Sequence, residues 1–268
     1  MEINAETKKI LSEHYGTRDE GARLKSKHGS VEFLTTMKYV EKYLKPGDKI
    51  IEIGAGTGRY SLALAKMGYT VDAVELVESN VEIIKNNATP GEEINITQGD
   101  ALDLSAFDDE AYDITLLLGP LYHLFTEKDK KRALGEALRV TKKGGIIFAA
   151  YIISDASILF NGFKRNAYNI AEFIEKGYID PATFAARSEP ALIFELVRKE
   201  DIDRLIANLP VKRLHYVASD GCSADLGEEL DAMDDAAFEL YLRYHFAVCE
   251  RADMAGMTAH SLDVLKKL

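Results

Sequence analysis

The sequence predicts an α/β fold, in which a mostly parallel, seven-stranded sheet carries helices on both faces. In its first part, short and nearly continuous apolar runs alternate with helical patterns. These runs lie at 49–53, 70–74, 94–97, 112–118 and 146–153. Such runs are typical of strands buried on both faces, and parallel strands need crossover helices between them. The 47% hydrophobic and 29% charged residues are those of an ordinary globular protein, which excludes a disordered chain or a fibre.

The helices of this first part follow from apolar spacing and from stop signals. They are expected at 31–45, 60–67, 78–87 and 128–140. Pro46-Gly47 ends the first of them, since proline cannot continue a helix. The basic residues and glycines of Lys142-Lys143-Gly144-Gly145 are typical of a helix C-terminus, so we expect them to close the last one.

After Ile153 the alternation stops. Helical patterns at 158–168 and 171–176 predict a mainly helical insertion over 154–197, packed on the functional edge of the sheet, with at most a short strand at 192–197. The elements that then complete the sheet are a helix at 199–208, a strand at 211–218, a helix at 234–251 and a strand at 259–265.

Charge and composition exclude several classes of protein. The 33 basic and 44 acidic side chains give a net charge of −11, which argues against nucleic acid as a partner. No apolar run approaches the roughly 18–20 residues that cross a bilayer, and the N-terminus lacks the apolar core of a signal peptide. A cytoplasmic protein with no membrane partner is therefore expected. Cys222 and Cys249 do not form a disulfide framework or a metal-ligand cluster, so no metal site is expected.

A glycine-rich loop follows the first predicted strand. Residues 51–59 read Ile-Glu-Ile-Gly-Ala-Gly-Thr-Gly-Arg. In open α/β sheets, ligands bind where such a loop leaves the carboxyl end of a strand. A dinucleotide fingerprint needs Gly or Ala where Arg59 stands, and a P-loop needs Gly-Lys-Ser/Thr where Gly58-Arg59-Tyr60 stands. Both nucleotide motifs are therefore disfavoured.

The spacing E-x-G-x-G-x-G resembles the first motif of the class I S-adenosylmethionine (SAM) dependent methyltransferases, which have a Rossmann-like fold. In that family the loop surrounds the amino-acid half of SAM. The resemblance thus implies a SAM contact for Glu52, Gly54, Ala55, Gly56 and Gly58. It covers residues 30–153 well, the C-terminal strands loosely and the insertion hardly at all.

Three further positions match the family in the expected order, each at the carboxyl end of a strand. Glu75 ends the second strand, and the resemblance implies that it binds both ribose hydroxyls while Leu76 packs on the adenine. Asp100 and Ala101 would meet the edge of the adenine. The backbone near Leu118 and Gly119 would contact the methionine moiety. The implied cofactor is SAM and the implied product is S-adenosylhomocysteine (SAH).

The residues after the fourth strand bear on the methyl acceptor. They read Leu-Gly-Pro-Leu-Tyr-His-Leu over 118–124, whereas methylases of nucleobase amino groups carry Asn/Asp-Pro-Pro-aromatic there. This segment resembles that of bacterial small-molecule methyltransferases of ubiquinone and menaquinone biosynthesis, and His28-Gly-Ser-Val-Glu-Phe resembles a branch of their uncharacterised relatives. His123 is the candidate general base, because an ordinary imidazole accepts protons near neutral pH. Tyr122 is a candidate for orienting the substrate.

The expected organisation has four parts, and several alternatives stay open. Residues 1–30 form a helical lid in which Tyr15, Arg23 and His28 cover the cofactor, or a plain surface helix. The SAM-binding core covers 31–153, the aromatic-rich insertion at 154–197 caps the substrate or simply packs, and 198–268 complete the sheet. The function expected is methyl transfer to a small molecule. The alternatives are an RNA or protein acceptor, a SAM-binding protein without transferase activity and, last, an NAD-linked oxidoreductase. The oligomeric state is open.

Overall fold

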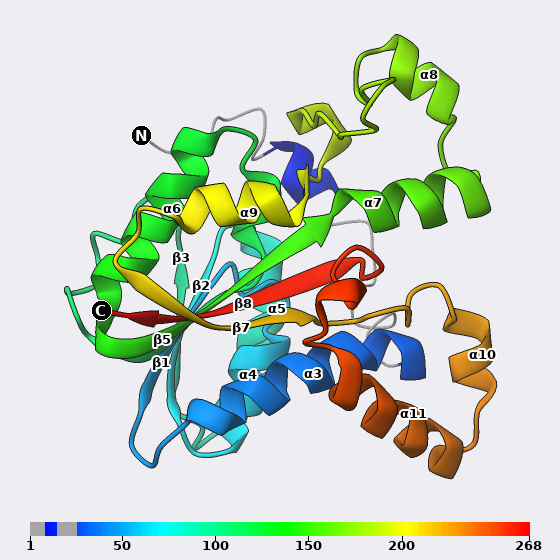
Figure 1. Cartoon of the computed structure of the whole chain (residues 1–268). Helices are drawn as coiled ribbons and strands as arrows, with labels where there is room; N and C mark the ends of the chain where they lie inside the picture. The colour runs from blue at the N-terminus through cyan, green and yellow to red at the C-terminus, as the bar shows by residue number, and fades with distance from the viewer. Residues whose placement is uncertain (1–8, 15–25) are drawn as a thin grey trace.

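The computed structural model describes residues 9–14 and 26–268, and a mixed sheet forms its centre (Figure 1). The strand order is β3-β2-β1-β4-β5-β8-β7, and β6 pairs with β5 beside this path. The strands are β1 (Lys49–Ile53), β2 (Thr70–Glu75), β3 (Ile94–Gln98), β4 (Tyr112–Leu117), β5 (Thr141–Ile153), β6 (Leu196–Val197), β7 (Val211–Ala218) and β8 (His260–Lys267).

The seven-stranded, mostly parallel sheet predicted from the sequence is confirmed. Strands β3, β2, β1, β4 and β5 are parallel, β8 is antiparallel to β5, and β7 is antiparallel to β8. The two-residue strand β6 falls within the 192–197 stretch expected for it. Because of the two antiparallel pairings, β7 ends and β8 begins at the edge where the parallel strands end.

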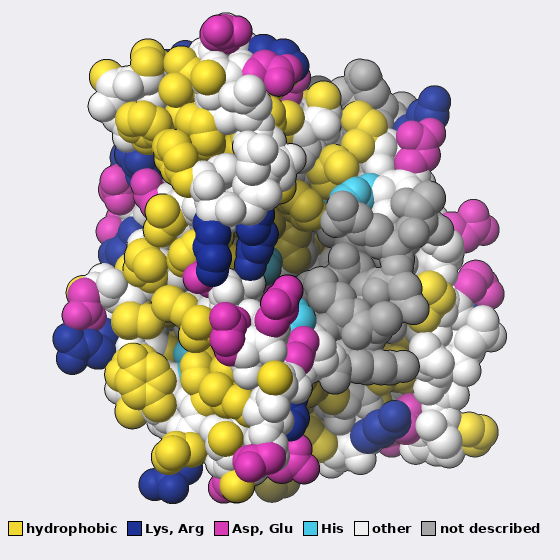
Figure 2. All heavy atoms as spheres, turned by 90° about the vertical axis from the view of Figure 1, so that its right-hand side faces the viewer, with side chains coloured by type: hydrophobic (Ala, Val, Ile, Leu, Met, Phe, Trp, Pro, Cys, Tyr) yellow, Lys and Arg dark blue, Asp and Glu magenta, His cyan; other side chains and the backbone are white. Residues whose placement is uncertain are grey.

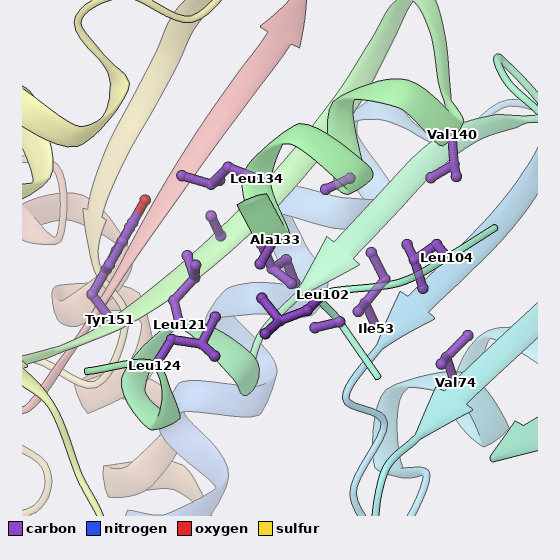
Figure 3. Packing of buried hydrophobic residues seen from close by; sticks show 14 of the residues in the cluster. Ile53, Val74, Leu102, Leu104, Leu121, Leu124, Ala133, Leu134, Val140 and Tyr151 are labelled. Atoms are coloured by element: carbon purple, nitrogen blue, oxygen red, sulfur yellow. The ribbon is translucent and has the colours of Figure 1, made fainter. Parts of the chain in front are cut away.

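Helices cover both faces of the sheet, α3, α4 and α5 on one side and α6 and α9 on the other (Figure 1). They are α3 (Lys27–Tyr43), α4 (Arg59–Lys66), α5 (Glu78–Asn87), α6 (Glu127–Val140) and α9 (Lys199–Ile206). On the α3 side, Phe148 of β5 is completely buried. On the α6 side, Leu134 shares a core with Ile53 and with Leu121 of the 3₁₀ helix η1 (Pro120–His123) (Figure 3).

The expected glycine stop after the fourth helix is wrong. Helix α6 ends at Val140, and Lys142–Gly145 already belong to β5. The hydroxyl of Thr141 donates to the carbonyl of Ala137 and finishes the helix three residues before the first glycine. The glycines instead serve an irregular strand start, where the pairing of β4 with β5 shifts register. Gly144 has φ +80°, and a Cβ on Gly145 would lie 2.9 Å from the carbonyl of Asp113.

Two helical segments leave the carboxyl edge of the sheet. The insertion after β5 holds α7 (Ser154–Ala156), a π-helix η2 (Ser157–Lys164), α8 (Ile170–Glu175) and the 3₁₀ helix η3 (Pro190–Leu192). The segment between β7 and β8 holds α10 (Gly227–Ala232), α11 (Asp235–Val248) and η4 (Ala252–Met254). Lys164 of the insertion pairs with Asp225 of the second segment at 2.9 Å, so the two segments meet above the sheet edge.

Over 9–14 and 26–268, the chain has no helix that is both long and apolar enough to pass through a bilayer. Within the same ranges no three or more His, Cys, Asp or Glu side chains are grouped so that they could hold a metal ion.

Candidate functional site

A cavity of about 600 Å³ opens at the carboxyl edge of the sheet, between the glycine loop and the insertion. Its volume is in the range of small-molecule and cofactor sites. The structure brings most of the sequence-predicted residues to its wall. These are Glu52, Gly54, Ala55, Gly56, Glu75, Leu76, Ala101, Leu118, Gly119 and His123. Gly58 and Asp100 do not line the cavity.

The glycine loop takes a backbone path that other residues would resist. Gly54, Gly56 and Gly58 have φ of +75°, +55° and +83°, all in the left-handed region. A Cβ on Gly54 would lie 2.7 Å from the ring of Pro120, and one on Gly58 would lie 2.9 Å from Ile84. A Cβ on Gly56 would meet nothing within 4 Å. Gly54 and Gly58 thus let the loop pack, while Gly56 presents bare backbone to the open cavity.

Glu75 fastens this loop from the end of β2. One carboxylate oxygen, Oε2, accepts from the backbone N–H of Gly56 at 2.7 Å. The other, Oε1, accepts from the N–H of Val77 at 2.9 Å and from the amide of Asn80 at 3.3 Å. Burial raises the pKa of Glu75 although these hydrogen bonds oppose the shift. A carboxylate has about four acceptor positions, so Glu75 can still accept from a ligand hydroxyl.

Glu52 is a second buried acid on the cavity wall, and it is only 2% exposed. Its Oε2 accepts from the N–H of Ser61 at 2.9 Å and from the Ser61 hydroxyl, near the start of α4. Burial raises the pKa of Glu52 to about 8, and the nearby charge of Glu75 adds to the rise. A cationic ligand in the cavity would favour the ionised form of this carboxyl group.

Asp100 holds the turn that follows β3. Its side chain is buried, and Oδ1 accepts from the N–H of Leu102 at 2.9 Å, as in an Asx turn. Its neighbours Gly99 and Ala101 line the cavity instead. The structure therefore places the backbone on either side of Asp100 on the cavity wall.

His123 lies in η1 under the insertion and is 8% exposed. Its Nδ1 is 2.9 Å from the carbonyl of Ile193, a β-branched residue with φ +69°, so the ring holds a strained turn. Burial, with a smaller contribution from the nearby charge of His14, lowers the pKa of His123 to about 4, although the hydrogen bond to Ile193 opposes the shift. At neutral pH the imidazole is uncharged and a weak proton acceptor. It packs against Phe194 with ring centroids 5.4 Å apart.

The end of the cavity under the insertion is lined by both apolar and polar side chains. Its apolar side chains come from β5, α7, η2, β6 and the loop before β6; they are Ile152, Ala156, Phe160, Phe194 and Leu196. The polar side chains at this end are Glu32, Ser157, Asn161, Arg165 and His260. Glu32 and His260 were missed from the sequence. One signal could have found His260, which stands at the start of the last predicted strand, at the functional edge of the sheet.

Only part of the segment expected to form a lid lies within the described residues. Residues 9–14 are helical, Leu11 lines the cavity, and the ring of His14 contacts Phe194 at 5.6 Å between centroids. Tyr15 and Arg23 lie outside the described residues. His28 does not line the cavity; its Nδ1 is 2.7 Å from Asp231 of α10.

Comparison with known proteins identifies the domain that carries this site. The profile of a methyltransferase domain matches residues 51–149. A ubiquinone biosynthesis O-methyltransferase of Coxiella burnetii is 28% identical over 150 residues, covering 52% of this chain and 62% of the relative. A demethylmenaquinone methyltransferase of Clavibacter sepedonicus is 34% identical over 102 residues, covering 38% and 40%. The chain thus spans less than two thirds of the length of these curated relatives.

Solved structures share the whole architecture at low sequence identity. A Pyrococcus horikoshii protein superposes with a TM-score of 0.60 at 14% identity, covering 96% of this chain and 99% of that one. A Thermotoga maritima SAM-dependent methyltransferase gives 0.57 at 19% identity, covering 97% and 99%. Residues 51–149 thus form a methyltransferase domain, the strand order is that of the class I SAM-dependent methyltransferase fold, and the chain is distantly similar to methyltransferases of ubiquinone and menaquinone biosynthesis.

Proposed function

We propose that this protein transfers a methyl group from SAM to a small-molecule acceptor held in the same cavity. The observation that carries the proposal is the composition of that one cavity. Bare glycine backbone and two acids line one end, and a chamber with both apolar and polar side chains under the insertion forms the other. When SAM is bound, it supplies a methyl group made electrophilic by the sulfonium sulfur.

The protein's own residues then bind and orient. Glu52 pairs with the ammonium of the methionine moiety, and the backbone of Gly54–Gly56 and of Leu118-Gly119 surrounds the rest of that moiety. Glu75 accepts from the ribose hydroxyls. Leu76 and Ala101 contact the adenine, since both lie on the cavity wall. In this arrangement 31–153 hold the cofactor, 154–197 cap the acceptor and 198–268 complete the sheet.

A small acceptor fits the site better than a macromolecule. The insertion and the segment between β7 and β8 close over the acceptor end and are joined by the Lys164–Asp225 pair. The net charge of −11 disfavours nucleic acid. The named relatives support the same class, because they are methyltransferases of ubiquinone and menaquinone biosynthesis.

Calorimetric titration with SAM and SAH tests the cofactor site. We expect micromolar binding to the wild type, and a loss of about 1–3 kcal/mol, or roughly 5- to 150-fold, in Glu75→Ala, since that change removes the ribose acceptor and the anchor of Gly56. Glu78→Ala, at an exposed glutamate nearby on α5, is the matched control and should bind as the wild type does. A folded protein that binds NADH but neither SAM nor SAH would contradict the proposal.

A further inference from the structure

A histidine paired with a buried carboxylate faces the acceptor end of the cavity. Nδ1 of His260 lies 2.8 Å from Oδ2 of Asp220. The backbone N–H of His260 donates to Oδ1 of Asp220 at 2.9 Å, and the hydroxyl of Thr258 donates to the same oxygen. His260 lines the cavity, whereas Asp220 is 4% exposed and lies behind it. Asp220 thus holds His260 through Nδ1 and the backbone N–H, at a position on the cavity wall.

The sheet topology explains why the pair sits there. Asp220 follows β7 by two residues, and His260 is the first residue of β8. Since β7 and β8 are antiparallel, the end of one strand and the start of the other are adjacent. In the pairing of β8 with β5, His260 lies opposite Ile152, a cavity residue close to the end of β5. The pair therefore stands at the same sheet edge as the glycine loop.

The charges around His260 suit a ring that gains a proton. Burial alone would raise the pKa of Asp220, but the charge of His260 and the hydrogen bonds to Asp220 outweigh it and keep that pKa below its usual range. Asp220 is therefore a carboxylate that can balance an imidazolium. Glu32 of α3 adds a second carboxylate, with Oε2 3.8 Å from Nδ1 of His260. It comes from the His28-Gly-Ser-Val-Glu-Phe stretch.

We propose that His260 is the general base of the methyl transfer, positioned by Asp220, and that the acceptor atom carries a proton, as in a hydroxyl or an amine N–H. The inference rests on the proposed function. The acceptor atom forms the bond to the methyl carbon, while the carbon–sulfur bond breaks and its electron pair stays on sulfur. The acceptor's proton passes to Nε2 of His260, and the imidazolium, balanced by Asp220, returns it to solvent.

His123, which also lines the cavity, has a different partner at Nδ1. His123 hydrogen bonds through Nδ1 to the carbonyl of Ile193, which is neutral. A carbonyl fixes the orientation of the ring but cannot balance the charge that proton uptake creates. His123 is therefore a positioning residue for the turn at Ile193, and the proton acceptor is His260.

The first test needs no acceptor. Long-range ¹H–¹⁵N spectra of histidine-labelled protein at pH 8 report the tautomer of each ring, and His260→Gln assigns the signal. We expect the Nδ1–H tautomer for His260 and loss of that preference in Asp220→Asn. His215, whose Nδ1 is 2.7 Å from Glu250 and which lies outside the cavity wall, is the matched pair and should not change in Asp220→Asn. A His260 ring protonated on Nε2 would overturn the proposal.

The second test follows methyl label from SAM to three probes: catechol, benzylamine, and N,N-dimethylbenzylamine, which has no proton to lose. We expect transfer to catechol or benzylamine. The probe that is methylated shows whether the acceptor group is a hydroxyl or an amine. His260→Gln should lower kcat by about 10²- to 10⁴-fold, with KM for SAM and Kd for SAH within about twofold. Asp220→Asn should lower kcat less, Asp220→Glu should restore part of it, and His215→Gln should match the wild type.

The outcomes separate this inference from the proposed function. Equal kcat in His260→Gln and His215→Gln, transfer to the tertiary amine alone, or SAH binding without transfer to either protic probe would each overturn the role of His260. Failure of the wild type to bind SAM and SAH would instead overturn the proposed function, whatever tautomer His260 shows.

Discussion

Glu52 should make the stability of the free protein fall as pH rises, and Glu52→Gln should remove that fall. Burial raises the native pKa of Glu52 to about 8, against an ordinary value of 4.5. Because the native value is the higher one, its stabilising contribution is complete below about pH 4.5 and is lost as pH rises through about 8. Between these values the native state holds one proton more, so the free energy of unfolding falls by about 1.4 kcal/mol per pH unit. From pH 5 to 8 the loss is roughly 3 kcal/mol.

Urea unfolding at pH 5, 6, 7 and 8 measures this effect, followed by circular dichroism because the chain has no tryptophan. The amide introduced by Glu52→Gln keeps an acceptor oxygen for Ser61 and cannot ionise, so subtracting the two curves isolates Glu52. Glu136→Gln is the control. Arg139 lowers the pKa of Glu136, so its contribution is lost only as pH falls, and its slope above pH 5 should match the wild type. An unchanged slope in Glu52→Gln would show that the buried carboxyl is already ionised and would refute the reasoning.

Two further substitutions test the loop and the core. Gly54→Ala puts a Cβ 2.7 Å from Pro120 at φ +75° and should abolish SAH binding in calorimetry, whereas Gly135→Ala in α6, with nothing within 4 Å, should raise the free energy of unfolding by roughly 0.5–1 kcal/mol. Tight SAH binding by Gly54→Ala would contradict this packing. Phe148→Ala removes a fully buried ring and should cost about 3–5 kcal/mol in urea unfolding, while Phe163→Ala, 60% exposed, should stay within about 0.5 kcal/mol.

The parts of the fold that depend on local pattern were predictable. The strands at 49–53 and 211–218 have the bounds expected from their apolar residues. The conformation of Lys142–Gly145 was not predictable, because it depends on a residue distant in the sequence. A Cβ on Gly145 would lie too close to the carbonyl of Asp113 on β4. A glycine after basic residues has the same appearance at a helix end and at an irregular strand start, and only the neighbouring strand decides between them.

The candidate site likewise has a part that could be predicted from the sequence and a part that could not. The glycine loop and Glu75 follow their strands directly, so spacing alone places them on the cavity. Asp220 and His260 are 40 residues apart and meet only because β7 and β8 pair. In the sequence, Asp220 opens an acidic stretch over 220–239, which hides its burial among solvated charges. No local pattern distinguishes a carboxylate that faces water from one that faces a histidine.

The insertion at 154–197 is attached to the rest of the molecule by ion pairs of different exposure on its two sides. On the η1 side, the Lys130–Glu195 pair is 11% and 15% exposed, and the Glu195 N–H donates to the Tyr122 carbonyl at 2.8 Å. On the other side, Lys164 and its partner Asp225 are 56% and 17% exposed, and Arg165 donates to the Ala224 carbonyl. Figure 2 views this side and shows basic side chains of the upper part of the molecule above acidic ones of the lower part. An exposed pair contributes at most about 1 kcal/mol, and breaking a buried pair costs several. The attachment at Lys164 is therefore the more exposed of the two, and Arg165, the next residue, lines the cavity on that side.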